Sequence, residues 1–394
     1  MSPIVQDKAP DEAQSGAFTN LEAGLEEETS PRSVLWRLFD NKNSIRKPLP
    51  PIPQTSIERQ HAAVHDHALN VSALLQDDQR KEHSLKQKTV LYLGYGSNMS
   101  SQTLRKTRGI TPLSQINVCV PDLCLTFDLP GVPYLEPCFA ATQYRDPATG
   151  RPRYPNGRLA SDADRQHKHE DEDEEEHTLL PPHHSTADET TTWRKPLVGV
   201  VYEVTLSDYA HIIATEGGGA SYQDIAVDCY PFPAPYDPSH PVPDHPTTTP
   251  FRAHTLLSPT HQHSSTQPNG DTTPRKSHRI RDPTYAQPSP RYKSLLVTGA
   301  HEHDLPTSYR AYLSSIQAYY VTTRRQRVGQ VLVQTLWLPL LLFSIVLSAL
   351  FADERGKAPR WLVRVQKGLF EGIWWSYDVV LRKVFGDGER TIGT

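Results

Sequence analysis

The sequence predicts an α+β fold in which short strands and helices alternate between long polar inserts, with a hydrophobic segment near the C-terminal end. Three observations lead to this prediction. Short runs rich in β-branched and aromatic residues begin at Thr89, Leu197 and Ser221. Stretches with helical spacing and polar starts follow at Asp208 and Thr307. Residues 328–352 form a run of 25 residues without a charged side chain.

Composition favours one folded domain with extensive disordered segments. The chain has 394 residues, 35 of them proline, and its Pro-rich, Ser/Thr-rich and acidic stretches cannot bury enough apolar surface to offset the entropy of ordering them. We therefore expect disorder in the extension 1–86 and in two inserts near 146–192 and 232–288. A catalytic domain over 87–327 remains between and around these inserts.

Charge and cysteine content exclude several classes of protein. The net charge is −4, and no basic cluster is interleaved with aromatic residues, so the sequence predicts no nucleic-acid partner. The four cysteines lack a CxxC pair, which is typical of a reducing compartment. The first residues lack the basic start and apolar run of a secretory signal, so we expect a cytosolic catalytic domain.

The folded elements are expected in the order strand, helix, strand, helix, strand and then further helices. The strand Ser221–Tyr230 places Ile225, Val227 and Cys229 on one face, the period of a half-buried strand. Either Ser207 or Asp208 is expected to cap the helix before it. The remaining expected elements are strands at Thr89–Leu93, Leu197–Thr205 and Phe251–Leu257, and helices at Asp208–Thr215, Arg291–Gly299 and Thr307–Tyr319.

The first candidate motif is Tyr95-Gly96-Ser97-Asn98, which directly follows the strand at Thr89. Glycine at Gly96 allows a ligand to approach the backbone closely. Successive amides in such a turn, at the start of the next helix, can bind a carboxylate or a developing oxyanion. The alternative is an ordinary strand-to-helix turn with a polar cap.

The second candidate is Glu216, which stands at the end of a short helix before three glycines and Tyr222. A carboxylate there faces the negative end of the helix dipole, which is unfavourable by roughly 0.3–1 kcal/mol. The glycines let the chain turn sharply and can aim the carboxylate into a cavity. The alternative is a glycine cap beside a solvated glutamate.

Taken together, these motifs resemble the γ-glutamylcyclotransferase family. The resemblance is strongest to the fungal branch that includes the cyclotransferase of gliotoxin biosynthesis. It rests on separated segments in the family's order, which are Val90–Asn98, Gly199–Tyr222, Pro288-Ser289-Pro290 with Tyr292, Gly299-Ala300 and Leu305-Pro306.

The resemblance implies a small mixed β-barrel with surrounding helices and no cofactor or metal. It implies that Glu216 is the catalytic acid and base, and that Tyr95, Gly96, Ser97 and Asn98 bind the substrate. Tyr222 is a further candidate for lining the site, with simple packing as the alternative. The family cleaves γ-glutamyl compounds by attack of the α-amine on the γ-carbonyl, which gives 5-oxoproline and an amine.

Other acidic and histidine residues are weaker candidates. We expect Glu203 to face the surface of its strand and Glu136 to lie in a loop before Pro137. The paired histidines have no third ligand at a fixed spacing, so solvated side chains are expected instead of a metal site.

The hydrophobic segment 328–352 is long enough to cross a bilayer as a single helix, and residues 353–394 are expected to form an amphipathic tail in the membrane interface. The sequence thus predicts a single-pass C-terminal anchor that contacts membrane lipid, with the catalytic domain in the cytosol. A re-entrant hairpin is the alternative.

Two rival functions stay open at this stage. One keeps the chemistry and changes the substrate to a γ-glutamyl amine, glutathione or a glutathione-conjugated secondary metabolite. The other is a catalytically silent scaffold at a membrane that binds a ligand or partner through its inserts.

Overall fold

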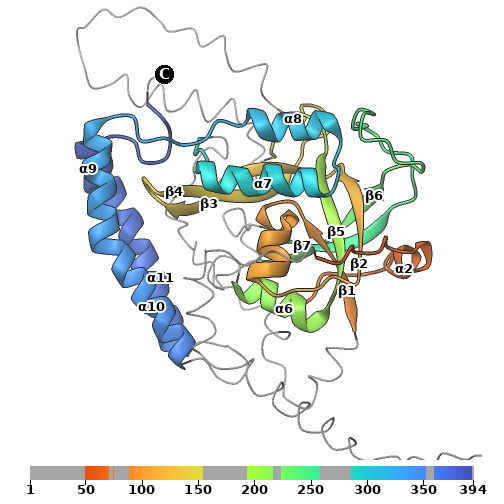
Figure 1. Cartoon of the computed structure of the whole chain (residues 1–394), viewed down its shortest axis with the longest axis horizontal. Coiled ribbons are helices and arrows are strands. Elements are labelled where there is room, and N and C mark those ends of the chain that lie inside the picture. Colours follow the sequence, from red (N-terminus) through yellow and green to blue (C-terminus); the bar gives the residue numbers. More distant parts are fainter. Residues whose placement is uncertain are drawn as a thin grey trace, which may run out of the picture.

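The computed structural model describes residues 49–70, 74, 88–153, 193–215, 223–257, 285–351 and 359–392. Its centre is a closed β-barrel with helices packed around it, and a pair of long helical rods lies to one side (Figure 1). This arrangement confirms the expected mixed barrel with surrounding helices.

The barrel contains five strands in the order β1-β5-β2-β6-β7. Neighbouring strands are antiparallel except β7 and β1, which close the barrel as a parallel pair with Tyr92 opposite His254. The strands are β1 (Thr89–Gly94), β2 (Ser114–Val120), β5 (Leu197–Thr205), β6 (Gln223–Pro231) and β7 (Phe251–Leu257).

Alternation along the strands separates the barrel interior from its outer face. Ile225, Val227 and Cys229 are buried and lie opposite Thr255, Ala253 and Phe251, so the expected one-sided apolar face of this strand is confirmed as the interior. The register places Tyr92, Tyr202, Asp224 and His254 on the outer face, where they are nevertheless buried beneath other elements.

Helices α6 (Leu206–Thr215), α7 (Pro290–Glu302) and α8 (Thr307–Ser315) pack against the barrel. In Figure 1, α7 and α8 lie on one side of the strands and α6 on the other. Ser289 caps α7 by accepting from the amide of Tyr292. The cap of α6 is Thr205, whose hydroxyl accepts from the amide of Asp208 at 3.0 Å, so the expected cap at Ser207 or Asp208 was wrong.

A separate β-hairpin, β3 (Leu123–Val132) and β4 (Glu136–Tyr144), extends from the barrel toward the helical rods (Figure 1). We expected Glu136 to lie in a loop because Pro137 follows it. Glu136 instead pairs with Val132 in this two-stranded sheet, where every strand is an edge strand and tolerates proline.

Residues 49–70, expected to be disordered, pack on the barrel. The amide of Gln115 donates to the Pro53 carbonyl at 2.9 Å, and helix α2 (Ile57–Ala62) brings Arg59 to Glu203. Proline-rich chain folds here because β2 offers backbone partners and Ala63 enters the core. Residues 1–48 lie outside the described residues.

The C-terminal rods run side by side in opposite directions. The first consists of α9 (Arg324–Leu332), the π-helical turn η6 (Val333–Trp337) and α10 (Leu338–Phe351). The second consists of α11 (Arg360–Ser376), the π-helical turn η7 (Tyr377–Leu381) and α12 (Arg382–Phe385). Because α11 contacts α10 and α12 contacts α9, the chain returns to its starting point, and we call this unit the helical hairpin. Among the described residues, one helix, Arg324–Ser348, is long and apolar enough to cross a membrane.

Candidate active site

The candidate loop Tyr95–Asn98 leaves the end of β1 and enters a short 3-10 helix, η2 (Ser97–Met99). The first amides of a helix have no partner within it, and amides of this kind can bind an anion. A side chain at Gly96 would have its Cβ 3.3 Å from the Tyr292 hydroxyl and 3.4 Å from Ala140. Glycine therefore lets the loop pass closely between β4 and α7.

Helix α7 supports this loop from behind through a contact between backbones. A Cβ atom on Gly299 would lie 2.7 Å from Met99 and from the Ser100 amide nitrogen. The Met99 carbonyl accepts from Tyr202 Oη at 3.3 Å and contacts His303 Nε2 at 2.9 Å. Burial lowers the pKa of His303, which favours a neutral imidazole in this position.

The Asn98 side chain is held on both sides. It is 3% exposed. Its Nδ2 donates to Tyr92 Oη at 2.7 Å, and its Oδ1 accepts from Arg108 Nε at 3.0 Å. These bonds fix the orientation of the loop, so the Asn98 carboxamide has a structural role beside any contact with substrate.

Tyr95 ties the loop to the strand that closes the barrel. Its hydroxyl donates to the Leu256 carbonyl on β7 at 3.3 Å. The loop is thus fastened to β1, β7, α7 and the Arg108 segment, which is the rigidity that a preorganised oxyanion site requires.

A buried carboxylate lies on the outer face of the barrel beneath α6. Asp224 accepts hydrogen bonds from the Tyr209 hydroxyl and from the Leu69 amide, the latter at 2.5 Å, and lies 3.0 Å from His254 Nδ1. Asp224 and His254 are each 2% exposed. The Tyr209 ring lies 5.7 Å from that of Tyr92, which connects this cluster to Asn98.

Two other glutamates have structural partners. Burial alone would raise the pKa of Glu203, but hydrogen bonds from Thr89, Ser114 and Arg59 outweigh it and lower the pKa. These partner residues cover much of the Glu203 side chain, so the expectation of a surface-facing side chain was wrong. Glu136 accepts from the Ser289 hydroxyl and pairs with Arg291 at 2.5 Å, which anchors the start of α7.

Glu216 and Tyr222 lie outside the described residues. Helix α6 ends at Thr215 and β6 begins at Gln223, so the two described ends of this segment flank them. The roles of Glu216 and Tyr222 remain predictions from the sequence.

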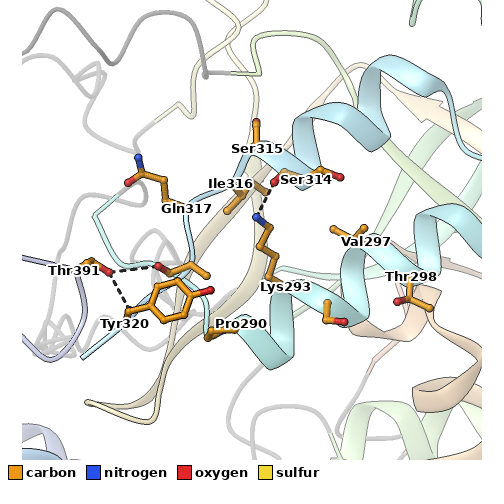
Figure 2. Close-up of a pocket in the computed structure, with 12 residues that line it drawn as sticks. Pro290, Lys293, Val297, Thr298, Ser314, Ser315, Ile316, Gln317, Tyr320 and Thr391 are labelled. Carbon is orange, nitrogen blue, oxygen red and sulfur yellow. Dashed lines mark hydrogen bonds between the residues drawn. The ribbon is translucent and has the colours of Figure 1, made fainter. Parts of the chain in front are cut away.

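A surface groove lies on the side of α7 that faces away from the Tyr95–Asn98 loop (Figure 2). Lys293 and Val297 line it, whereas Tyr292, Leu296 and Gly299 of the same helix are buried facing inward. The Lys293 ammonium donates to the Ser314 carbonyl at 2.6 Å. No acidic residue is among the described residues that line the groove.

Metal chemistry receives no support from the described ranges, within which no three His, Cys, Asp or Glu side chains cluster. The four cysteines are free and buried, and burial raises the pKa of Cys119 to about 12, which makes it a poor nucleophile.

The barrel and its loop have the form expected of a γ-glutamylcyclotransferase, and comparisons with known proteins confirm that resemblance. The γ-glutamyl cyclotransferase aclK of Aspergillus oryzae is 26% identical over 306 residues, which cover 76% of this chain and 90% of that protein. The γ-glutamyl cyclotransferase gliK of Aspergillus fumigatus is 29% identical over 303 residues, covering 76% and 89%.

The helical hairpin has its own match. Residues 323–384 match the family model described as the AclK C-terminal domain.

A solved structure called γ-glutamyl cyclotransferase is 15% identical and covers 60% of this chain and 93% of that one, with a TM-score of 0.33. A TM-score this low does not by itself establish a shared fold.

Sequence reasoning located the loop but missed the residues that hold it. Tyr92, Arg108, Asp224 and His254 carry no motif of their own. Asp224 and His254 stand in strands that also carry Asp228 and Arg252, so no signal in the sequence singled them out.

Proposed function

We propose that this protein is a γ-glutamylcyclotransferase that releases 5-oxoproline and an amine or amino acid from a γ-glutamyl compound. The observation that carries the proposal is the Tyr95–Asn98 loop, held rigidly at the end of β1 by Tyr92, Arg108 and α7. The names of the relatives, which match this chain over 76% of its length, support a cyclotransferase-type function.

The proposed reaction needs one proton carrier and one anion site. The Glu216 carboxylate takes a proton from the substrate's α-ammonium group, and the freed amine attacks the γ-carbonyl carbon. A nitrogen–carbon bond forms, Glu216 passes the proton to the departing nitrogen, and the bond to that nitrogen breaks. The attacking nitrogen then gives up its second proton through Glu216 to the released amine, so that the products are the lactam N–H of 5-oxoproline and an ammonium group. Because both reacting groups belong to one molecule, the enzyme has only to fold the substrate and stabilise the oxyanion. The amides of Tyr95–Asn98 are the proposed oxyanion donors.

The test is 5-oxoproline release by the full chain and by its Glu216→Gln variant. The full chain is required because residues 49–70 are part of the fold. Glu216→Gln should lose activity by about 100-fold or more, since general acid–base catalysis contributes 10²–10⁴-fold. Glu203→Gln is the matched control, because Glu203 is occupied by structural partners. Activity that survives in Glu216→Gln but is lost in Asp224→Asn would move the proton carrier to the buried Asp224–His254 pair.

A substrate panel distinguishes the remaining possibilities. γ-Glutamyl dipeptides, γ-glutamyl amines, glutathione and a glutathione conjugate should each be assayed at equal concentration. The silent scaffold would bind one of them without releasing 5-oxoproline.

Membrane attachment through the C-terminal segment is part of the proposal. Its support is the length and the apolar surface of the helix Arg324–Ser348. Only 11% of its most apolar stretch is buried, whereas the core helix of a soluble protein is mostly buried.

A further inference from the structure

The helical hairpin exposes large apolar side chains on more than one side of α10. Each residue of a helix turns the side-chain direction by about 100°, so Leu342, Phe343 and Ile345 point in three different directions. All three are exposed, Phe343 at 60%. A protein partner covers one stripe of a helix, whereas lipid can surround most of it. This distribution favours lipid over a second copy of the chain.

The second rod of the hairpin is amphipathic. Helix α11 faces α10 through Gln366, whose Nε2 donates to the Ser348 hydroxyl at 2.8 Å. On its outer side it carries Arg364, Lys367 and Glu371, all exposed, with Lys367 and Glu371 3.8 Å apart. The two rods together therefore have one apolar side and one charged side.

This charge pattern argues against a hairpin that stands across the bilayer. Because α11 runs alongside α10, the charged residues in its middle would then lie at hydrocarbon depth. Each charge at the centre of a bilayer disfavours insertion on the order of a hundredfold. Lying in the plane of the interface avoids this cost, since the charged side can remain in water while α10 enters the apolar layer.

Both ends of the hairpin are fastened to the barrel domain at one point, the turn of the β3–β4 hairpin. Tyr134 Oη donates to the Gly386 carbonyl at 2.7 Å, just after α12. The Tyr134 carbonyl accepts from Gln330 Nε2 of α9 at 2.8 Å. Gln326 of α9 also donates to the Asp387 carbonyl at 2.7 Å. A chain that crossed a bilayer once between these points would have to break these contacts.

The fastened end of the hairpin is also strongly basic. Exposed cations from the start of the first rod and the end of the second gather there, namely Arg324, Arg325, Arg327, Arg382 and Lys383. Basic residues beside an apolar helix attract anionic lipid headgroups.

We propose that the helical hairpin is a one-sided membrane anchor that lies in the surface of an anionic bilayer, with α10 in the apolar layer and the charged side of α11 toward water. The barrel and the C-terminal residues 386–392 then lie on the same side of the membrane. This differs from a single-pass anchor, which would place the tail on the opposite side.

The first test measures flotation of the full chain with vesicles of phosphatidylcholine, with and without phosphatidylserine. Binding should be at least tenfold tighter with the anionic lipid and should weaken as salt rises. Leu342→Glu combined with Phe343→Glu should reduce binding at least tenfold. Leu113→Glu, at a leucine 48% exposed far from the hairpin in sequence, is the matched control and should bind as the parent does.

Further measurements separate loss of membrane binding from a folding defect and from dimerisation. Thermal unfolding should be unchanged in both variants. Ile345→Glu, at an exposed isoleucine of α10, provides a second α10 variant in case the double change impairs folding. A dimer without lipid that the α10 changes convert to a monomer, together with no vesicle binding, would assign this face to a second copy and overturn the proposal. Glu216→Gln should bind vesicles normally, which separates this test from the catalytic one.

Topology is tested by synthesis of the chain with microsomes and a C-terminal epitope. Protease added from the side of the barrel should remove the epitope without detergent. An epitope that is protected until detergent is added would show a spanning helix and refute the in-plane anchor.

Discussion

Replacing Gly299 by alanine should displace the candidate loop, because α7 and η2 touch backbone to backbone at this point. The added Cβ would lie 2.7 Å from Met99 and from the Ser100 amide nitrogen, closer than nonbonded carbon atoms pack. Relief of this overlap by backbone movement costs about 1–3 kcal/mol. Alanine returns up to about 1 kcal/mol through its higher helix propensity. The net loss of stability should therefore be roughly 0–2 kcal/mol.

A second glycine isolates the overlap from the propensity. Gly368 lies inside α11, and a Cβ added there would meet nothing within 4 Å. Gly368→Ala should stabilise the chain by up to about 1 kcal/mol. The difference between the two variants, about 1–3 kcal/mol, then measures the overlap alone.

The two assays are urea unfolding and 5-oxoproline release. A displacement of about 1 Å in a catalytic group can cost on the order of 100-fold in rate. We expect Gly299→Ala to lower kcat/KM at least tenfold, whereas Gly368→Ala should leave it unchanged. Equal stability and equal activity in both variants would refute the close packing of α7 against the loop.

Three further predictions concern the buried polar groups. Tyr92→Phe removes the acceptor of the Asn98 Nδ2 bond and should cost about 1–3 kcal/mol in urea unfolding; no loss would mean that this bond does not hold the loop. Asp224→Asn should cost about 1–3 kcal/mol, because an amide replaces one of the carboxylate oxygens that bind Tyr209, the Leu69 amide and His254; unchanged unfolding would contradict a stabilising role for these bonds. The pKa of Glu203 is lowered in the folded chain, so its stabilisation is present above the unfolded pKa of about 4.3 and is lost as pH falls through the folded value. Chemical unfolding of Glu203→Gln should therefore show a deficit at neutral pH that shrinks in acid, and a deficit independent of pH would contradict this assignment.

The elements that sequence reasoning found are those with a strong local pattern. The strand Leu197–Thr205 has the predicted bounds, and α7 was found but extends from Pro290 to Glu302. Helix α8 ends at Ser315, four residues before the expected end. The strands β2, β3 and β4 were not predicted. Strand β2 is defined by pairing with β5 and β6, which are distant in the chain, whereas β3 and β4 form a hairpin whose second strand begins at Glu136-Pro137. Proline misled twice, since Pro137 lies in an edge strand and Pro53 pairs with β2.

The site was predictable where it depends on a contiguous motif. Tyr95–Asn98 stands out because one glycine and two small polar residues follow a buried strand. The partners of Asn98 are Tyr92, on strand β1, and Arg108, and no local sequence pattern connects these residues. The packing of α11 against α10 could not be predicted from the sequence either. A hydropathy pattern predicts an apolar segment but does not indicate which helix packs against it.

The central claim is that both reacting groups belong to the substrate. It is tested most directly by identifying the product formed in heavy-oxygen water. The full chain should convert a γ-glutamyl compound to 5-oxoproline and an equimolar amount of amine, with no solvent oxygen in either product. Glutamate carrying solvent oxygen would show hydrolysis by water, and would contradict intramolecular cyclisation.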